Sequence, residues 1–339
     1  MNMVIYIHRL FKEEELKMGK LKYLSLFSGV GSPEMALRDL GIEYELVGFS
    51  EIDDRAIKSY CAIHGVSEAS NLGDITKIDI STLPKDIDLI THGSPCQDFS
   101  VSGFKAGADE GSGTRSSLMW NTVAICESIK PKYVIWENVK GVLQKSQIHN
   151  FEKYLKRMEQ IGYTNYYKIL NAKHFGVAQD RDRMFVVSIR NDINSKFEFP
   201  KEYNYEVRLK DVLDKDVDER FFVKKVLNPR KTKKYIQYDN SGKGYNSQAA
   251  RLYYLEGQMC TLPKCNGGDK TQVLLDEKEM IGRRITPCEA WRLMGFSMED
   301  FLKAEQSGQS FGSLYGQAGN SIVLPVIKGI LKNLLLTQN

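Results

Sequence analysis

The stretch "HGSPCQDFSVSG", residues 92–103, places a proline directly before Cys96 and then continues through small polar residues without apolar periodicity. Structural cysteines usually lie inside apolar runs, whereas Cys96 follows the apolar segment "DIDLIT" (86–91) and begins a loop. A thiol displayed at the end of a strand is suited to nucleophilic chemistry. A buried or incidental thiol is the alternative that this stretch alone leaves open.

Carboxyl and guanidinium groups stand beside other strand-like segments. Glu137 in "WENVKG" (136–141) ends a predicted strand, and in an open α/β sheet it would emerge at the same edge as Cys96, as an acid beside a nucleophile. Arg181 and Arg183 in "QDRDR" share one face of an extended segment and suit an anionic or carbonyl-bearing substrate. A helix-capping role for Glu137 and surface ion pairs for the arginines remain open on these segments alone.

The glycine-containing segment "FSGVGS" (27–32) lies between a predicted strand and a predicted helix, where backbone can approach a ligand closely. It lacks the full dinucleotide fingerprint, and Glu34 in the first helical turn would repel a pyrophosphate. Glu51, ending the second predicted strand, can accept hydrogen bonds from ribose hydroxyls, and Asp74, after a third β-like edge, from an adenine amino group. A nucleoside without phosphates, such as S-adenosylmethionine, fits; a structural turn and an ordinary strand-end acid are the alternatives.

Strand patterns alternate with helix patterns over the first half of the chain. The predicted strands cover residues 21–27, 44–53, 87–92, 132–138, 164–172 and 183–190, and the helix patterns end at Gly41 or cover residues 54–65, 117–129 and 151–162. This alternation predicts an α/β fold with a parallel or mostly parallel sheet covered on both faces.

The pattern changes twice after residue 190. Residues 191–280 are rich in turn residues and offer only short strands, whereas a capped helix is predicted over 286–296 and an apolar helix, interrupted near Pro325, over 319–336. We therefore predict four parts: an N-terminal extension (1–20), a catalytic and cofactor-binding domain (21–190), a smaller, irregular β-rich domain (191–280), and a return segment (281–339) that completes the small domain and packs a C-terminal helix on the first domain.

Composition excludes several protein classes. The 339 residues are 42% hydrophobic and 27% charged, as in ordinary soluble proteins, and no apolar run reaches the roughly 18 residues of a membrane helix. The six cysteines form no CxxC pair and no zinc pattern, so we expect a reduced, cytoplasmic protein without a metal. The net charge of +4 decides little, but residues 220–234 are basic with interleaved aromatics, which indicates either a phosphate-contacting stretch or a solvated basic face.

The ordered series "LFSGVGS", "SEID", "GDIT", "GSPCQDFS", "ENVKG", "QDRDR", "RRITPCEAWRLMGF" and "YGQAGNS" resembles the motif series of the DNA (cytosine-5) methyltransferases. The resemblance covers about residues 21–335. It implies a Rossmann-like S-adenosylmethionine-dependent methyltransferase fold, with residues 191–280 as the target recognition domain. Ser25, Ser32 and Ala178 stand where the family usually has an acid, a glycine and a proline, which puts cofactor affinity, but no reacting group, in doubt.

The resemblance also implies residue roles. Cys96 would add to C6 of a flipped cytosine, Glu137 would assist at N3, and Arg181 and Arg183 would hold the base and the reacting centre, while Asn138 would hold the loop of Cys96. The S-adenosylmethionine pocket, from which S-adenosylhomocysteine leaves, would be formed by Phe27, Gly29, Gly31, Glu51, Ile52, Asp74, Ile75, Pro95, Leu118, Asn320 and Ser321. DNA contacts would come from Ser102, Thr261 and Leu262, and Lys233 in the basic stretch is expected to contact a phosphate.

Double-stranded DNA is the expected partner, the chain is expected to be a monomer without a membrane partner, and a cognate restriction endonuclease is a possible companion. An RNA cytosine methyltransferase is the nearest alternative, but the long segment before "RRITPCEAWRLMGF" favours a reader of duplex sequence. A catalytically silent DNA-binding homologue is disfavoured because Cys96 and Glu137 are both present. A NAD-dependent dehydrogenase, which the glycine loop alone would suggest, is disfavoured by Glu34.

Overall fold

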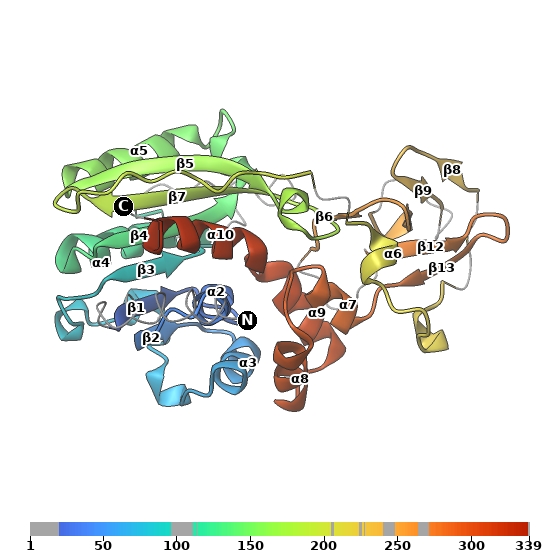
Figure 1. Ribbon diagram of the computed structural model, residues 1–339, viewed down its shortest axis with the longest axis horizontal. Helices are drawn as coiled ribbons and strands as arrows, with labels where there is room; N and C mark the ends of the chain where they lie inside the picture. The colour runs from blue at the N-terminus through green and yellow to red at the C-terminus, as the bar shows by residue number, and fades with distance from the viewer. Residues whose placement is uncertain are drawn as a thin grey trace, which may run out of the picture.

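The computed structural model describes residues 20–95, 111–112, 114–204, 207–223, 226, 228–239, 248–263 and 271–337. Figure 1 shows a large α/β part at one end of the long axis and a smaller sheet-rich part at the other. Three helices lie between them: α7 (Pro287–Arg292), α8 (Met298–Gln306) and α9 (Phe311–Asn320).

The large part is built on a six-stranded sheet in the order β2-β1-β3-β4-β7-β5. Its strands are β1 (Leu21–Leu26), β2 (Tyr44–Ser50), β3 (Leu89–His92), β4 (Tyr133–Val139), β5 (Tyr163–Asn171) and β7 (Asp182–Arg190). The first four pair in parallel, and β7 runs antiparallel to both β4 and β5. The predicted α/β fold with a mostly parallel sheet is therefore confirmed.

Helices cover both faces of this sheet because its strands are apolar on both sides. On one face, Tyr23 and Leu89 pack in a cluster with α2 (Ser32–Asp39) and α10 (Leu324–Leu335). On the other, Leu24 and Leu26 pack in a cluster with α4 (Met119–Ile129) and α5 (Ile148–Gln160). The helix α3 (Asp54–His64) follows β2 and contacts α8. Among the described residues, no helix has the length and apolarity needed to cross a membrane.

The C-terminal helix differs from the sequence prediction. Residues 319–336 do not form one interrupted helix, because α9 ends at Asn320 and α10 begins at Leu324, with Pro325 in its first turn. Proline is tolerated there since the first helical N–H groups have no intrahelical acceptor. The break therefore lies at residues 321–323, and Gly319 and Asn320 before it belong to α9, a helix that the sequence pattern did not reveal.

The small part contains a five-stranded sheet in the order β13-β12-β10-β9-β8. Its strands are β8 (Arg230–Lys231), β9 (Tyr235–Gln237), β10 (Arg251–Tyr254), β12 (Gln272–Asp276) and β13 (Ile281–Arg284). The short helix α6 (Leu209–Val212) precedes it. A two-stranded ladder of β6 (Gln179–Asp180) and β11 (Met259–Cys260) ties this part to the "QDRDR" segment before β7.

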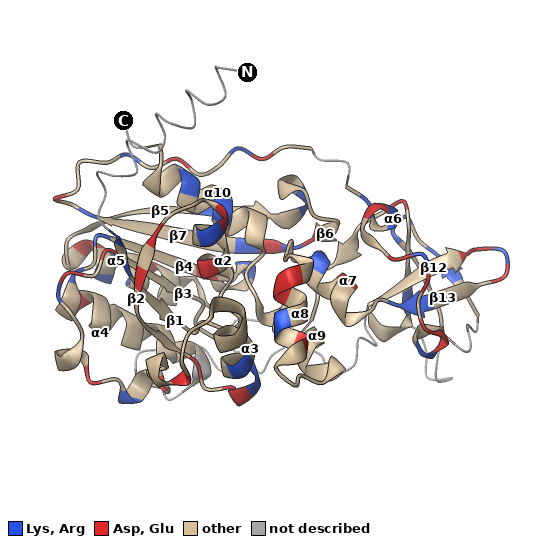
Figure 2. Cartoon of the chain, turned by 60° about the horizontal axis from the view of Figure 1, so that its bottom comes forward, with Lys and Arg blue, Asp and Glu red and all other residues tan. Residues whose placement is uncertain are grey.

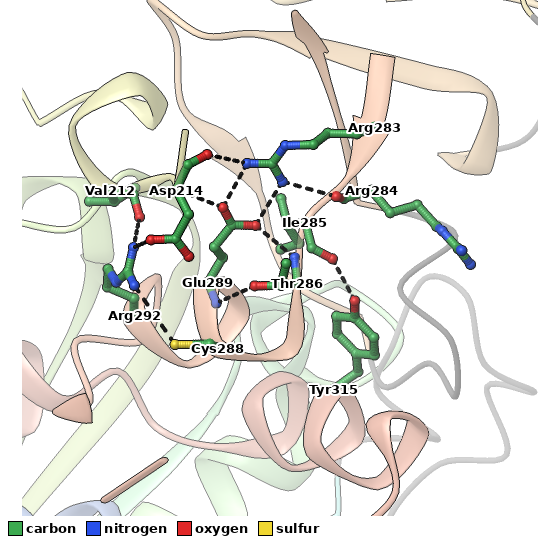
Figure 3. A network of polar contacts seen from close by, with 10 residues as sticks. All are labelled: Val212, Asp214, Arg283, Arg284, Ile285, Thr286, Cys288, Glu289, Arg292 and Tyr315. Atoms are coloured by element: carbon green, nitrogen blue, oxygen red, sulfur yellow. Dashed lines mark hydrogen bonds and ion pairs between the residues drawn. The ribbon is translucent and has the colours of Figure 1, made fainter. Parts of the chain in front are cut away.

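A buried ion pair fastens the small sheet to the helices between the two parts (Figure 3). The Arg283 guanidinium on β13 donates to both carboxylate oxygens of Glu289 on α7, at 2.7 and 2.8 Å, and both side chains are inaccessible to solvent. Glu289 also accepts from the backbone N–H groups of Asp214 and Thr286. The Tyr315 hydroxyl on α9 donates to the Ile285 carbonyl. The chain segments that enter and leave the small sheet are thus held on α7 and α9.

Candidate active site

The carboxyl ends of β1 to β4 open into one cavity of about 520 Å³, closed on another side by α9. Crevices at this edge of an α/β sheet are where such folds bind ligands, and the volume lies within the roughly 300–1,000 Å³ of small-molecule sites. Twelve of the residues predicted for catalysis or cofactor binding line it: Phe27, Gly29, Glu51, Ile52, Asp74, Ile75, Pro95, Leu118, Glu137, Arg181, Arg183 and Asn320. The structure therefore brings residues from distant parts of the sequence into one space.

Glu51 is held rigidly at the end of β2. Its Oε2 accepts from the Gly29 N–H at 2.9 Å, and its Oε1 accepts from the N–H groups of Ile52 and Asp53 at 2.8 and 3.0 Å. Gly29 has φ of +57°, and a Cβ built there would have no heavy atom within 4 Å, so it borders open space. Three backbone donors thus fix an acceptor carboxylate against the loop that follows β1.

The loop after β1 is strained at Phe27, which has φ of 54° although it is not glycine. Such conformations are uncommon for bulky residues and persist where surrounding structure imposes them, often at ligand sites. Phe27 lines the cavity, and Ile52, which is 73% exposed, lines it from the end of β2. Two apolar side chains therefore line the same cavity as the Glu51 carboxylate.

Asp74 lies on the cavity wall, between a parallel β-bridge that joins Asn71 to Phe49 and a short 3₁₀ helix (Ile75–Lys77). Asp74 caps this helix, and its Oδ1 accepts from the Thr76 N–H and hydroxyl at 2.9 and 2.8 Å. These hydrogen bonds lower the pKa of Asp74 below its usual value. The group is an ionised acceptor at neutral pH.

Three glycine-loop and motif residues lie elsewhere. Gly31 does not line the cavity; it has φ of +81°, and a Cβ there would lie 2.1 Å from His64 Nε2. Ser321 lies beside the main cavity in a smaller one of about 50 Å³. Glu34 is fully buried and accepts from the Tyr60 hydroxyl at 2.7 Å. Glu34 therefore lies in the first turn of α2, as predicted, but turns into the core and does not line the cavity.

Glu137 at the end of β4 is buried at the cavity wall and pairs with Arg183 on β7. The Arg183 Nε lies 3.1 Å from Glu137 Oε1. Burial raises the pKa of Glu137 above its usual value, and the positive charges of Arg183 and Arg181 offset only part of that effect. A carboxyl in this setting can hold a proton and donate it to a bound group.

Arg181 has a supporting position that its sequence spacing did not reveal. The side chain is 2% exposed, and its Nη2 donates to the carbonyls of Gly319 and Ser321 at the end of α9, at 3.0 and 2.9 Å. Its Nη1 donates to the Leu262 carbonyl. Arg181 therefore joins α9, the segment after β11 and the cavity wall.

The chain after β3 is held by β4. Asn138 Nδ2 donates to the Ser94 carbonyl at 3.1 Å, and Trp136 Nε1 donates to the Ser94 hydroxyl at 3.1 Å. These bonds fix the segment that leads into Pro95, which lines the cavity. Cys96, the next residue, and Ser102 lie outside the described residues.

One wall of the cavity was missed by sequence reasoning. Gly312, Gly316 and Gly319 lie along one face of α9 and line the cavity together with Gln317. A Cβ built on Gly316 would have no heavy atom within 4 Å, so the glycines leave room at this wall. The spacing of 4 and 3 between small residues was the available signal, because such positions share a helix face.

The family model for C-5 cytosine-specific DNA methylases matches residues 21–336 of this chain. The chain belongs to this family. The type II methyltransferase M2.ScrFI of Lactococcus lactis subsp. cremoris is 35% identical over 376 aligned residues, covering 94% of this chain and 100% of that protein. The orphan methyltransferase M.SPBetaI of Bacillus phage SPbeta is 31% identical over 442 aligned residues, covering 94% and 98%.

Solved structures show the same fold. The Dnmt2 methyltransferase of S. pombe superposes with a TM-score of 0.69 at 21% sequence identity, covering 94% of this chain and 99% of that one. A DNMT2 variant of Spodoptera frugiperda has a TM-score of 0.68 at 20% identity, with 93% and 99% coverage. Family membership makes this chain an enzyme of the DNA (cytosine-5-)-methyltransferase class and implies use of S-adenosylmethionine.

The residues predicted to contact DNA take different positions in this methyltransferase. Lys233 is exposed in the turn between β8 and β9. Thr261 and Leu262 follow β11 and pack on the "QDRDR" segment: the Thr261 hydroxyl donates to the Asp180 carbonyl, and the Leu262 N–H donates to Gln179 Oε1. Leu262 is buried, so its position supports that segment. In the described ranges no group of three or more His, Cys, Asp or Glu side chains could hold a metal ion.

Proposed function

We propose that this methyltransferase is sequence-specific and transfers a methyl group from S-adenosylmethionine to C5 of a cytosine flipped out of duplex DNA. The observation that carries the proposal is the shared cavity. The rigid Glu51 carboxylate and the buried Glu137 carboxyl open into the same space, at opposite sides of the segment leading into Pro95. One side is suited to a nucleoside cofactor and the other to a base that needs a proton donor.

The chemistry of the cofactor side fits S-adenosylmethionine. Glu51 would accept hydrogen bonds from the ribose hydroxyls, Ile52 and Leu118 would pack against the adenine, and Asp74 would accept from its amino group. Phe27, Gly29 and Asn320 would surround the amino-acid end. When bound, S-adenosylmethionine supplies the methyl group as an electrophile.

On the base side, Cys96 would add its thiolate to C6 of the cytosine, which makes C5 nucleophilic. Glu137, protonated because of its burial, would donate to N3 as the sulfur–C6 bond forms. Once C5 carries the methyl group, the C5 proton would be lost to water, and the electron pair of that C–H bond would re-form the C5–C6 double bond and expel the Cys96 thiolate while N3 returns its proton to Glu137. Arg183 would hold the Glu137 carboxyl in place, and Arg181 would keep the end of α9 against the site. The role of Cys96 rests on its place in the motif series and stays a prediction.

Duplex DNA is proposed as the substrate for two reasons. The named relatives are type II and phage orphan methyltransferases of a DNA methylase family. The chain also has a separate small sheet apart from the large one, and residues of this part would read the duplex sequence. Chemistry on a base requires its removal from the stack, so the enzyme is proposed to flip its target. The recognition sequence, the monomeric state and a cognate endonuclease stay predictions.

Bisulfite sequencing tests the proposal directly. Unmethylated duplex DNA is incubated with the protein and S-adenosylmethionine, with the Cys96→Ser variant and a matched pool of structured RNA alongside. We expect protected cytosines at one short repeated sequence in the DNA and none with the variant. Protection of RNA but not DNA would overturn the choice of substrate, and protection that survives Cys96→Ser would overturn the nucleophile.

A further inference from the structure

Two arginines and two phenylalanines form a compact cluster, the Arg220–Phe311 cluster, where the small sheet meets α9. The Arg220 Cζ lies 4.6 Å from the Phe311 ring centroid and 5.2 Å from that of Phe221. The two rings stack at 6.1 Å with an interplanar angle of 25°. The Arg284 Cζ lies 6.0 Å from the Phe221 ring, and its Nη2 donates to the Arg220 carbonyl at 2.6 Å.

The cluster holds a charged group in a fixed place without burying it. Phe221 is buried, whereas the Arg220 side chain is 58% exposed and Phe311 is 39% exposed. Contacts between a guanidinium and aromatic faces restrict the side chain while leaving its N–H donors available. Such a pre-organised guanidinium binds oxyanions at a smaller entropic cost than a free side chain.

The location of the cluster ties it to the catalytic cavity. Phe311 is the first residue of α9, and the next two residues, Gly312 and Ser313, line the cavity. Arg220 belongs to a 3₁₀ helix (Glu219–Phe221), and Arg284 ends β13, where Figure 2 shows basic residues. The charge therefore lies at the rim between the two parts of the chain.

Nearby acidic groups are exposed and weakly held. The Asp218 Oδ2 lies 3.6 Å from Arg220 Nε, and both side chains are 58% exposed. Glu219 is also exposed. Exposed pairs of this kind contribute little to stability, so a polyanion can replace Asp218 as the partner of Arg220. From residue 220 to residue 234 the sequence contains seven basic residues and no acid, a charge excess that favours an anionic partner for this segment.

We propose that the Arg220–Phe311 cluster anchors a backbone phosphate of the substrate DNA at the rim of the cavity. The inference rests on the proposed function and adds to it a contact that the motif series does not contain. Because a phosphate carries no base information, this contact would act on all sequences alike. It would fix the position of the duplex relative to α9, whose glycine face lines the site.

The test compares Arg220→Gln with Arg157→Gln, an exposed arginine that pairs with Glu127 on the helices behind the large sheet. Fluorescence anisotropy gives Kd for a duplex with the recognition sequence and for an unrelated duplex over a series of KCl concentrations. For Arg220→Gln we expect Kd to rise roughly fivefold on both duplexes, and the slope of log K against log salt to fall by about 0.9. Cofactor affinity and thermal stability should not change.

Two further variants separate the charge from the packing. Arg220→Lys keeps the charge but loses the planar stack on the rings. Phe311→Leu keeps an apolar neighbour but loses the aromatic face. Both variants should retain the wild-type salt slope and weaken DNA binding by less than Arg220→Gln. If Arg220→Gln has the same Kd and salt slope as Arg157→Gln, this inference is overturned while the proposed function stands. Wild-type protein that binds no duplex DNA would overturn the proposed function and this inference with it.

Discussion

The Nε of Arg183 lies 3.1 Å from Oε1 of Glu137, and yet the pKa of this carboxyl is raised rather than lowered. A neighbouring cation stabilises the ionised form of a carboxyl, whereas burial destabilises it. Burial is the larger effect here because Glu137 lies at the end of a central strand, with its side chain almost entirely removed from solvent. The pair thus combines a fixed orientation with a carboxyl that can carry a proton.

The pH dependence of turnover follows from this balance. If the protonated carboxyl is the working form, activity falls as pH rises through the pKa of Glu137. Arg183→Met removes a positive charge that favours ionisation, so the alkaline limb of the kcat/KM profile should move to higher pH while the maximal rate falls. Lys140→Gln, which removes an exposed lysine paired with Asp182, should leave the limb in place. A limb that moves to lower pH in Arg183→Met would contradict the acid role.

Replacing the acid itself separates chemistry from binding. Glu137→Gln keeps the size of the side chain but cannot supply the proton with the same ease, so the rate should fall by about 10²- to 10⁴-fold. Cofactor affinity, measured by calorimetry, should remain near the wild-type value, because the proposed cofactor group Glu51 follows β2, which β1 and β3 separate from β4 and Glu137. Equal losses in rate and in cofactor affinity would show that Glu137 acts through the structure of the pocket.

Two glycines of the loop after β1 should respond differently to alanine. Gly31→Ala places a Cβ 2.1 Å from His64 Nε2 at a positive φ. The free energy of unfolding should therefore fall by roughly 2–4 kcal/mol. The Cβ of Gly29→Ala has no heavy atom within 4 Å, so the free energy of unfolding should fall by only about 1 kcal/mol. The added methyl group enters the cavity, however, and should weaken S-adenosylmethionine binding. Thermal unfolding and calorimetric titration measure the two effects. The opposite assignment, with Gly29→Ala the less stable protein, would contradict this explanation.

The sequence predicted the parts of the site that depend on local pattern. The apolar run at 132–138 predicted β4, and the rule that parallel strands share a carboxyl edge predicted that Glu137 would emerge beside the segment of Cys96. Glu137 and Pro95, the residue before Cys96, line one cavity. The α/β alternation was sufficient for the large sheet because its central strands, β1, β3, β4 and β7, are buried on both faces. These features need no knowledge of distant contacts.

The remainder depends on tertiary contacts that no local pattern reports. Arg181 was predicted to face a ligand, but its guanidinium also donates to carbonyls at the end of α9, 138 and 140 positions later in the chain. Glu34 has the position of a loop-facing acid in the sequence, and only the packing of Tyr60 shows that it turns inward. The glycine face of α9 escaped notice because glycine-rich sequence is a weak helix signal.

The buried pair between Arg283 and Glu289 should be the most sensitive point for stability outside the cavity. Glu289→Ala leaves the Arg283 guanidinium buried without its charge partner, and the N–H groups of Asp214 and Thr286 lose their acceptor. The free energy of unfolding should therefore fall by about 3–5 kcal/mol. Denaturant unfolding measures it. Glu299→Ala, which breaks an exposed pair with Lys303 on α8, is the control and should change stability by under about 0.5 kcal/mol. Similar values for the two variants would contradict the role assigned to burial.

Lys233 and Lys234 are adjacent but should contribute differently to DNA binding. Lys234 Nζ pairs with Asp180 Oδ2 at 2.9 Å, which ties the small sheet to the "QDRDR" segment, whereas Lys233 is exposed in the same turn. If Lys233 contacts a phosphate, Lys233→Ala should weaken binding to all duplexes alike and lower the salt slope by about 0.9. Lys332→Ala, at the end of α10 that points away from the small sheet in Figure 1, should change neither quantity. An altered recognition sequence in Lys233→Ala would show instead that this lysine reads a base.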